Sequence, residues 1–249
     1  MGTLSRKRWG LRWAAWLVAA ITLPVLVYLA WDQATYNFGQ VLPGAIFRSG
    51  QMPPSALAQT IRERGIKTVL NLRGSNPSDA WYRNELAATL DNGATHVDVA
   101  MSSCLWISHA QLHALVETLE KSERPLLIHC AWGSERTGLT AAFAELLQPA
   151  GTLDDARAQF SIRYLFVRMN DGKVMAEHLD QYESWLHRIG LTHSPDNFKR
   201  WVDEGFKPGH PSREDWPYDP YPLVIINRPD DRPRVEPLAT ETRSLPARH

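Results

Sequence analysis

Short apolar runs alternate with helical patterns between residues 39 and 204, and three of these runs have the length of strands. They cover residues 66–72, 94–99 and 125–129. Each run is followed by residues typical of turns and then by a helical pattern. Strands that alternate with helices predict an α/β fold class, with a mostly parallel central sheet flanked by helices on both faces.

Helix starts in this block are marked by a Ser or Thr and a second residue that favours the first turn. The three pairs are Ser108 with Gln111, Thr152 with Asp155, and Ser194 with Pro195. After the first pair, apolar residues recur at the i, i+3, i+4, i+7 spacing of one helix face, at Leu112, Leu115, Val116 and Leu119. The block therefore contains both element types needed for a layered domain.

The N-terminal end has a different composition. Residues 1–12 form a basic flank without an acidic residue, and residues 13–31 are 19 consecutive residues without a charge. A transmembrane helix needs ~20 predominantly apolar residues. We therefore expect a single-pass membrane anchor over 13–31, with a cytoplasmic N-terminus and the remainder outside the cytoplasm, periplasmic in a bacterium. A cleaved signal peptide is the alternative.

The C-terminal end is rich in proline. Nine of the 17 prolines fall between Pro208 and Pro246, which excludes long helices and central strands there. The apolar residues 223–226 predict an edge strand, and the segment from 232 onward predicts a disordered tail. The expected organisation is the flank, the anchor, one domain over 39–204, and a partly disordered Pro-rich extension over 205–249.

Charge and cysteine content narrow the chemistry. The 27 basic and 27 acidic residues give a net charge of zero, so we expect no nucleic-acid partner. Two cysteines, Cys104 and Cys130, are too few for a structural zinc site made mainly of cysteine, and we expect no metal. A disulfide between them remains open in an oxidising compartment.

The most informative segment follows the apolar run 125–129. Five residues separate Cys130 from Arg136, and an apolar helix comes next. Backbone N–H groups of such a loop, at a helix N-terminus, bind a tetrahedral dianion, and Arg adds a bidentate contact. The same groups would keep Cys130 as a thiolate at neutral pH. The expected phosphate-binding residues are Ala131, Trp132, Gly133, Ser134, Glu135 and Arg136.

This segment resembles the active-site loop of the cysteine-dependent protein tyrosine and dual-specificity phosphatases, H-C-x-x-G-x-x-R-[ST]. The match is complete over residues 129–137. Residues 47–51 and 68–73 look like the opening of the compact dual-specificity-like members found in bacteria. The resemblance covers about residues 40–190 and implies a phosphatase-like fold.

The resemblance also implies roles for individual residues. Cys130 would be the nucleophile that forms a cysteinyl-phosphate, and Arg136 would bind the phosphate. His129 would support the thiolate, and Thr137 would assist departure of the sulfur. No metal or organic cofactor is implied, because the loop supplies the positive charge.

The proton donor to the leaving group is the open assignment. Family members usually use an Asp about thirty residues before the Cys, and Asp98 lies 32 residues before Cys130. The alternation of residues 96–99 places Asp98 on the strand rather than in the loop after it. Glu135 is the main alternative, and Asp171 is the third candidate.

The expected function is phosphomonoester hydrolysis by a cysteine-dependent, membrane-anchored phosphatase. A phosphoprotein phosphatase acting at Tyr, or with dual specificity, is the first expectation. A lipid phosphatase, favoured by the anchor and by Glu135 in the loop, and a non-catalytic phosphate-binding module are the alternatives. The expected partners are thus a phosphorylated protein or a phospholipid, together with the membrane.

Two further groups of residues have structural expectations. Arg48 and Arg73 are expected mainly in surface ion pairs, with added positive charge at the site as the alternative. Four aromatic residues are expected to pack helices in the core rather than to line a lipid slot: Tyr164, Phe166, Tyr182 and Trp185.

Overall fold

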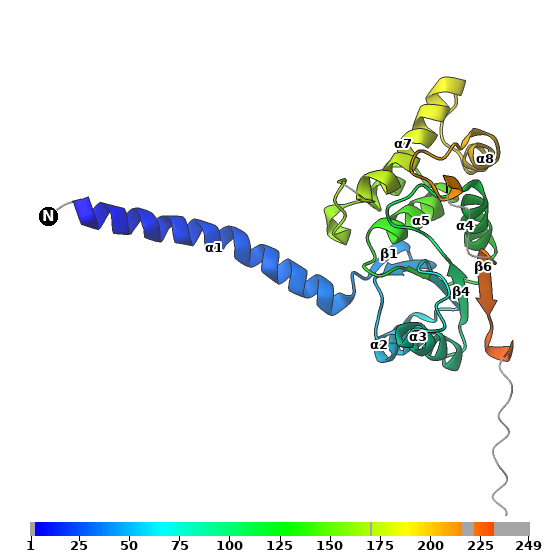
Figure 1. Ribbon diagram of the computed structural model, residues 1–249, viewed down its shortest axis with the longest axis horizontal. Coiled ribbons are helices and arrows are strands. Elements are labelled where there is room, and N and C mark those ends of the chain that lie inside the picture. The colour runs from blue at the N-terminus through cyan, green and yellow to red at the C-terminus, as the bar shows by residue number, and fades with distance from the viewer. Residues whose placement is uncertain (1–2, 170, 216–221, 232–249) are drawn as a thin grey trace, which may run out of the picture.

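A six-stranded sheet forms the centre of the computed structural model, which describes residues 3–169, 171–215 and 222–231 (Figure 1). The strand order is β1-β2-β5-β3-β4-β6. The four inner strands are parallel, whereas β1 and β6 add antiparallel edges. The bounds are β1 (Gly39–Leu42), β2 (Ile46–Ser49), β3 (Thr68–Asn71), β4 (Thr95–Val99), β5 (Leu126–His129) and β6 (Val224–Asn227). The α/β class and the parallel centre agree with the sequence, and the whole sheet is mixed.

Each of the three predicted inner strands is present, in a shorter form. Their side chains alternate between two cores, because successive residues of a strand point to opposite faces. On β5, Leu126 and Ile128 belong to one hydrophobic cluster and Leu127 belongs to the other. Both faces of the sheet are therefore buried, as parallel sheets require.

Helices cover the two faces unequally (Figure 1). One face packs against α2 (Pro54–Arg64) and α3 (Ala80–Asp91), through a small cluster that includes Leu57 and Ile61. A larger cluster lies on the other face, with α4 (His109–Lys121), α5 (Glu135–Leu146), α6 (Leu153–Ala158), α7 (Asp171–Ile189) and α8 (Pro195–Arg200). Tyr182 and Trp185 are buried in this larger cluster, as predicted, whereas Phe166 is buried outside it and Tyr164 is half-buried.

The predicted helix starts are confirmed. Ser108 and Gln111 form a complete capping box at the start of α4, and Thr152 and Asp155 form another at α6. Ser194 accepts a hydrogen bond from the backbone N–H of Asn197 at the start of α8. Local hydrogen bonding alone explains these three starts, because a cap uses residues within one turn.

The N-terminal helix corrects the predicted membrane anchor. α1 (Thr3–Thr35) extends away from the domain (Figure 1). A membrane span needs ~20 consecutive, predominantly apolar residues, and no described helix is long and apolar enough to cross a membrane. The predicted span over 13–31 is therefore wrong, and the single-pass topology, the membrane partner and the localisation outside the cytoplasm are withdrawn with it.

The last turns of α1 contact the domain. The hydroxyl of Tyr28 donates hydrogen bonds to the backbone oxygens of Arg163 at 2.6 Å and Ile162 at 3.2 Å. The guanidinium of Arg163 lies 4.6 Å from the centre of the Trp31 ring. These contacts fix where the helix joins the domain.

The C-terminal extension contributes to the domain before the described part ends. Phe206 is buried, and Trp106 and Ser212 form a β-bridge. β6, which matches the predicted edge strand, pairs with β4. The predicted disordered tail from 232 onward lies outside the described residues.

Replacing Ser108 by Ala tests the cap that starts α4. The buried Ser108 side chain accepts a hydrogen bond from the backbone N–H of Gln111 at 3.1 Å. Loss of such a cap costs about 1 kcal/mol. We therefore expect urea unfolding to give a free energy of unfolding that is lower by about that amount in Ser108→Ala. Ser122→Ala, at the other end of the same helix, is the control. Equal stability of the two variants would contradict the assignment.

Candidate active site

The predicted loop lies between the end of β5 and the start of α5. Cys130 follows β5 directly and is buried, and Arg136 is the second residue of α5. The backbone N–H of Gly133 donates a hydrogen bond to Sγ of Cys130 at 3.3 Å. The loop thus directs a backbone amide at the sulfur, beside a helix N-terminus that favours negative charge.

Gly133 is required by the geometry of this loop. Its φ is +72°, in the left-handed region. A Cβ at this position would lie 2.5 Å from the backbone nitrogen of Gly50 and 2.6 Å from the backbone carbon of Ser49. Any side chain would therefore meet both dihedral strain and fixed backbone atoms.

Arg48 of β2 holds the same turn from inside the domain. Its Nη2 donates to the backbone oxygen of Gly133 at 2.7 Å, and its Nη1 donates to the backbone oxygen of Gln159 at 2.8 Å. Burial lowers the pKa of Arg48 to about 10, although Tyr164 and Cys130 act in the opposite direction. The expected surface ion pair is wrong for Arg48, because β2 is buried along its whole length.

Arg136 is tied to the ends of two other strands. Its Nη1 donates to the backbone oxygens of Met101 at 3.3 Å and Leu72 at 3.5 Å. Leu72 follows β3 and Met101 lies two residues after β4. The guanidinium therefore sits at the carboxyl ends of parallel strands, where α/β folds usually bind ligands.

Two segments fix the outer side of the loop. The backbone N–H of Gln51 donates to the oxygen of Ala131 at 3.1 Å, and Nδ2 of Asn37 donates to the oxygen of Trp132 at 3.0 Å. These bonds leave the Trp132 side chain 69% exposed. The backbone of the predicted phosphate-binding residues is thus held in place while an aromatic ring faces outward.

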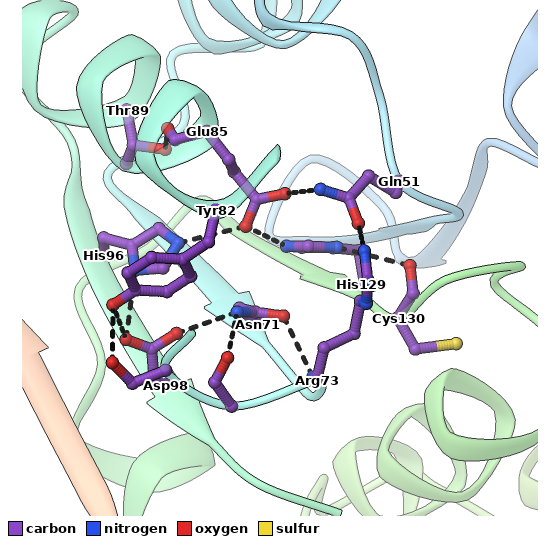
Figure 2. Close-up of polar contacts among 12 residues, drawn as sticks. Gln51, Asn71, Arg73, Tyr82, Glu85, Thr89, His96, Asp98, His129 and Cys130 are labelled. Atoms are coloured by element: carbon purple, nitrogen blue, oxygen red, sulfur yellow. Dashed lines mark hydrogen bonds and ion pairs between the residues drawn. The ribbon is translucent and has the colours of Figure 1, made fainter. Parts of the chain in front are cut away.

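A buried ionic cluster lies beside the loop (Figure 2). Oε1 of Glu85, a buried residue of α3, is 3.1 Å from Nε2 of His129 and 3.1 Å from Nε2 of His96. Its Oε2 accepts a hydrogen bond from Nε2 of Gln51 at 2.7 Å. The cluster therefore connects α3 to the residue that precedes Cys130.

Opposite charges balance within this cluster. Burial would raise the pKa of Glu85, but the nearby His129 and His96 outweigh it and hold that pKa at about 2. Burial also disfavours a charged imidazole, but the carboxylates of Asp98 and Glu85 raise the pKa of His96 to about 9. Removing one partner of such a group leaves a buried charge uncompensated.

Asp98 belongs to this cluster. It lies on β4, opposite Asn71 of β3, and is buried. Its Oδ2 accepts a hydrogen bond from the Tyr82 hydroxyl at 2.6 Å, and its Oδ1 accepts one from Asn71 at 2.8 Å. Figure 2 shows the Asp98 carboxylate facing Tyr82 and Asn71, whereas Sγ of Cys130 points away from the cluster.

The two other candidate acids are placed differently. Glu135 is the first residue of α5 and is half-buried. It lines a cavity of about 260 Å³ together with Tyr36, Trp132 and Leu165. Asp171 is the first residue of α7, and its side chain lies outside the described part of the structure.

The remaining predicted residues are Thr137 and Cys104. Thr137 is buried in the first turn of α5, and its hydroxyl finds no hydrogen-bond partner among the described residues. Both cysteines are free, and Cys104 is exposed, with its Sγ 3.3 Å from Oγ of Ser102. The Cys104–Cys130 disulfide in an oxidising compartment stays a hypothesis.

Sequence reasoning missed the residues that support the loop from a distance. Gln51 and Glu85 are 34 positions apart, and Arg48 and Gly133 are 85 apart. No local pattern marks such pairs. The only weak signal was the position of Arg48 directly after the apolar residues Ile46 and Phe47, which is unusual for a surface arginine. In the described residues, no group of three or more His, Cys, Asp or Glu side chains could hold a metal ion.

The pKa of His96 predicts a pH-dependent stability. Because this pKa is about 9 in the folded protein and about 6.5 in an unfolded chain, its contribution is complete below pH ~6.5 and is lost as the pH rises through ~9. We expect the free energy of unfolding to fall by on the order of 3 kcal/mol over this interval. His96→Asn should remove most of that slope in urea titrations.

His187→Gln provides the matched control, because His187 is an exposed histidine of α7. Its slope should equal that of the unmodified protein. A His96→Asn variant with an unchanged slope would show that His96 does not carry the buried charge.

Comparison with solved structures finds phosphatases. The core catalytic domain of the PP-IP phosphatase SIW14 from S. cerevisiae is 22% identical, with a TM-score of 0.46, over 62% of this chain and 93% of that one. TpbA from P. aeruginosa is 18% identical, with a TM-score of 0.46, over 59% of this chain and 88% of that one. A search of curated proteins gave no match.

The family assignment comes from a comparison with family models. The model described as "Tyrosine phosphatase family" matches residues 32–157, which is half of the chain. The matched region contains β1 to β5, the loop from Cys130 to Arg136, and the helix that follows it. The chain therefore belongs to the tyrosine phosphatase family and is a cysteine-dependent phosphatase.

Proposed function

We propose that the chain hydrolyses phosphomonoesters through a cysteinyl-phosphate at Cys130, and that its substrates are proteins phosphorylated on tyrosine. The observation that carries this proposal is the hydrogen bond from the Gly133 N–H to Sγ of Cys130, at 3.3 Å. A backbone donor aimed at sulfur stabilises a thiolate, and a thiolate is the reactive form of cysteine. The loop that supplies this donor also ends in Arg136.

In the first step, the thiolate of Cys130 attacks phosphorus. An S–P bond forms and the P–O bond to the leaving group breaks, while the equatorial oxygens are held by the loop amides and Arg136. A preorganised set of such donors stabilises the transition state without reorganisation. Glu85 lies 3.1 Å from Nε2 of His129 and so orients the imidazole ring. From the end of β5, the oriented His129 supports the thiolate of Cys130.

In the second step, a water molecule attacks the phosphorus of the intermediate. The water transfers a proton to the carboxylate that protonated the leaving group in the first step, the S–P bond breaks, its electron pair returns to sulfur, and inorganic phosphate is released. The buried hydroxyl of Thr137, on the first turn of α5, is proposed to donate a hydrogen bond to the departing sulfur. Its lack of another partner among the described residues supports this role.

Glu135 is proposed as the proton donor to the leaving oxygen, in preference to Asp98. Both carboxylate oxygens of Asp98 already accept hydrogen bonds, from Asn71 and Tyr82, and the residue is buried. Glu135 is half-buried and borders the cavity beside the loop. A proton donor must reach the substrate oxygen, and Glu135 is the better placed of the two.

The cavity beside the loop supports a peptide substrate. Its apolar lining includes Tyr36, Trp132 and Leu165, which can pack against side chains next to the phosphorylated residue. The lipid alternative depended on the membrane span, which is withdrawn, and on Glu135 in the loop, which an aryl or alkyl leaving group on a peptide can use equally. Phospholipid head groups therefore become a comparison substrate rather than a second proposal.

Cys130→Ser tests the nucleophile. We expect turnover of a phosphotyrosine peptide to fall at least about 10³-fold, while Cys104→Ser, the matched control, stays near the unmodified level. Mass spectrometry of the rapidly quenched enzyme should show phosphate bound at Cys130. Equal activity of Cys130→Ser and the unmodified chain, or hydrolysis of phospholipid head groups alone, would contradict the proposal.

Glu135→Gln tests the proton donor. For an alkyl phosphate, whose leaving group must be protonated, we expect a loss of about 10²–10⁴-fold in kcat, and a much smaller loss for an aryl phosphate with an acidic leaving group. Asp98→Asn is assayed in parallel on both substrates. If Asp98→Asn alone shows the leaving-group dependence, the proton comes from Asp98.

A further inference from the structure

Arg73 is the second arginine at the loop, beside Arg136. Nη1 of Arg136 contacts the backbone oxygen of Leu72, the residue just before Arg73. β3 and β5 are paired in register, with Asn71 opposite His129, so Arg73 and Cys130 leave the same edge of the sheet. The two guanidinium groups are therefore close to the same substrate position.

The Arg73 side chain is held in one place by its neighbours. Its Nη1 donates a hydrogen bond to Oε1 of Gln51, and its guanidinium lies 3.4 Å from the centre of the Trp81 ring. Gln51 is itself fixed, by Glu85 at 2.7 Å and by the backbone of Ala131 at 3.1 Å. The cation is therefore preorganised, which reduces the entropy cost of binding an anion.

The charge of Arg73 is not neutralised by a direct ion pair. Its close partners are a neutral amide and an aromatic ring, and no carboxylate of the described residues forms an ion pair with it. Glu85 and Asp79 act on it only at longer range. Partial burial, and after it the nearby Arg136, lower the pKa of Arg73, so an anion bound between the two arginines would relieve their repulsion.

The other buried arginine of the site has a different role. Arg48 is fully buried, and its two terminal nitrogens donate to Gln159 and Gly133. Arg73 is half-buried and remains accessible at the side of the loop. Of the two, only Arg73 is free to contact a substrate.

We propose that Arg73 binds a second anionic group next to the phosphate under attack, and so selects phosphopeptides with an acidic residue beside the phosphotyrosine. This inference rests on the proposed function, because it assumes a peptide substrate. Arg136 and the loop amides bind the reacting phosphate, and Arg73 binds the neighbouring carboxylate. A guanidinium suits this role because its planar donors match a carboxylate in a bidentate pair.

The first test compares two phosphotyrosine peptides that differ only in flanking residues, Glu in one and Gln in the other. The unmodified enzyme should show about tenfold higher kcat/KM on the acidic peptide. Arg73→Gln should reduce this ratio to about one, and Arg73→Lys should retain part of it because the charge remains. Arg83→Gln, a loss of charge at an exposed residue of α3, is the control and should keep the full ratio.

The second test measures binding without turnover. Cys130→Ser protein is titrated calorimetrically with inorganic phosphate and with diphosphate, which carries a second anionic group. Diphosphate should bind about tenfold more tightly, and adding Arg73→Gln should remove that preference.

The outcomes separate the two proposals. Peptide hydrolysis with an acidic-to-neutral ratio that Arg73→Gln does not change would overturn the role of Arg73 and leave the proposed function intact. Absence of peptide hydrolysis, with an Arg73-dependent preference for diphosphate, would overturn the peptide substrate and support the second anion contact.

Discussion

The hydrogen bond between Arg48 and the carbonyl of Gly133 is the contact on which the rest of the site depends. When the N–H groups of a tight loop point toward the ligand site, a carbonyl must point in the opposite direction. Here that carbonyl belongs to Gly133, which is buried. The guanidinium of Arg48 satisfies it at 2.7 Å, from inside the sheet. A buried cation is costly unless it is bonded, and Gln159 accepts hydrogen bonds from Nη1 of Arg48 through both its backbone oxygen and its side-chain oxygen.

A second buried polar group contacts His129, the residue that precedes Cys130. His129 and His96 both contact Oε1 of Glu85, and Gln51 donates a hydrogen bond to Oε2 of the same carboxylate. The cluster ties α3, β4 and β5 together just before Cys130. The same Gln51 reaches outward to Arg73 and inward to Glu85, so one amide side chain joins the buried cluster to the edge of the site.

The two buried groups leave a clear separation of tasks. Arg48 and Glu85 are buried charged residues that support the loop. Arg136 and Arg73 are partly exposed, so a substrate can contact them. Asp98 lies with the first set, since Asn71 and Tyr82 occupy its oxygens. Glu135, at the start of α5 and beside the cavity, lies with the second.

The sequence by itself determined the elements whose signals are local. Apolar runs placed β3, β4, β5 and β6, and capping residues such as Ser108 and Thr152 placed helix starts. The spacing of Cys130, Gly133 and Arg136 located the loop between β5 and α5, because such a loop is built from consecutive residues. The strands β1 and β2 gave no such run, because each contains only two apolar residues and Pro43 and Gly44 interrupt the sequence between them.

Only the tertiary structure decided which charged side chains are buried and what they contact. Arg48 and Glu85 look like surface residues in the sequence, because the partners of Arg48 are 85 and 111 positions away and those of Glu85 are 11 to 44 positions away along the chain. The run of residues 13–31 has the length and the absence of charge that predict a membrane span. No described helix, however, is apolar enough over a sufficient length to cross a membrane. Sequence patterns report neighbours within a turn or a strand, whereas a site depends on contacts that folding brings together.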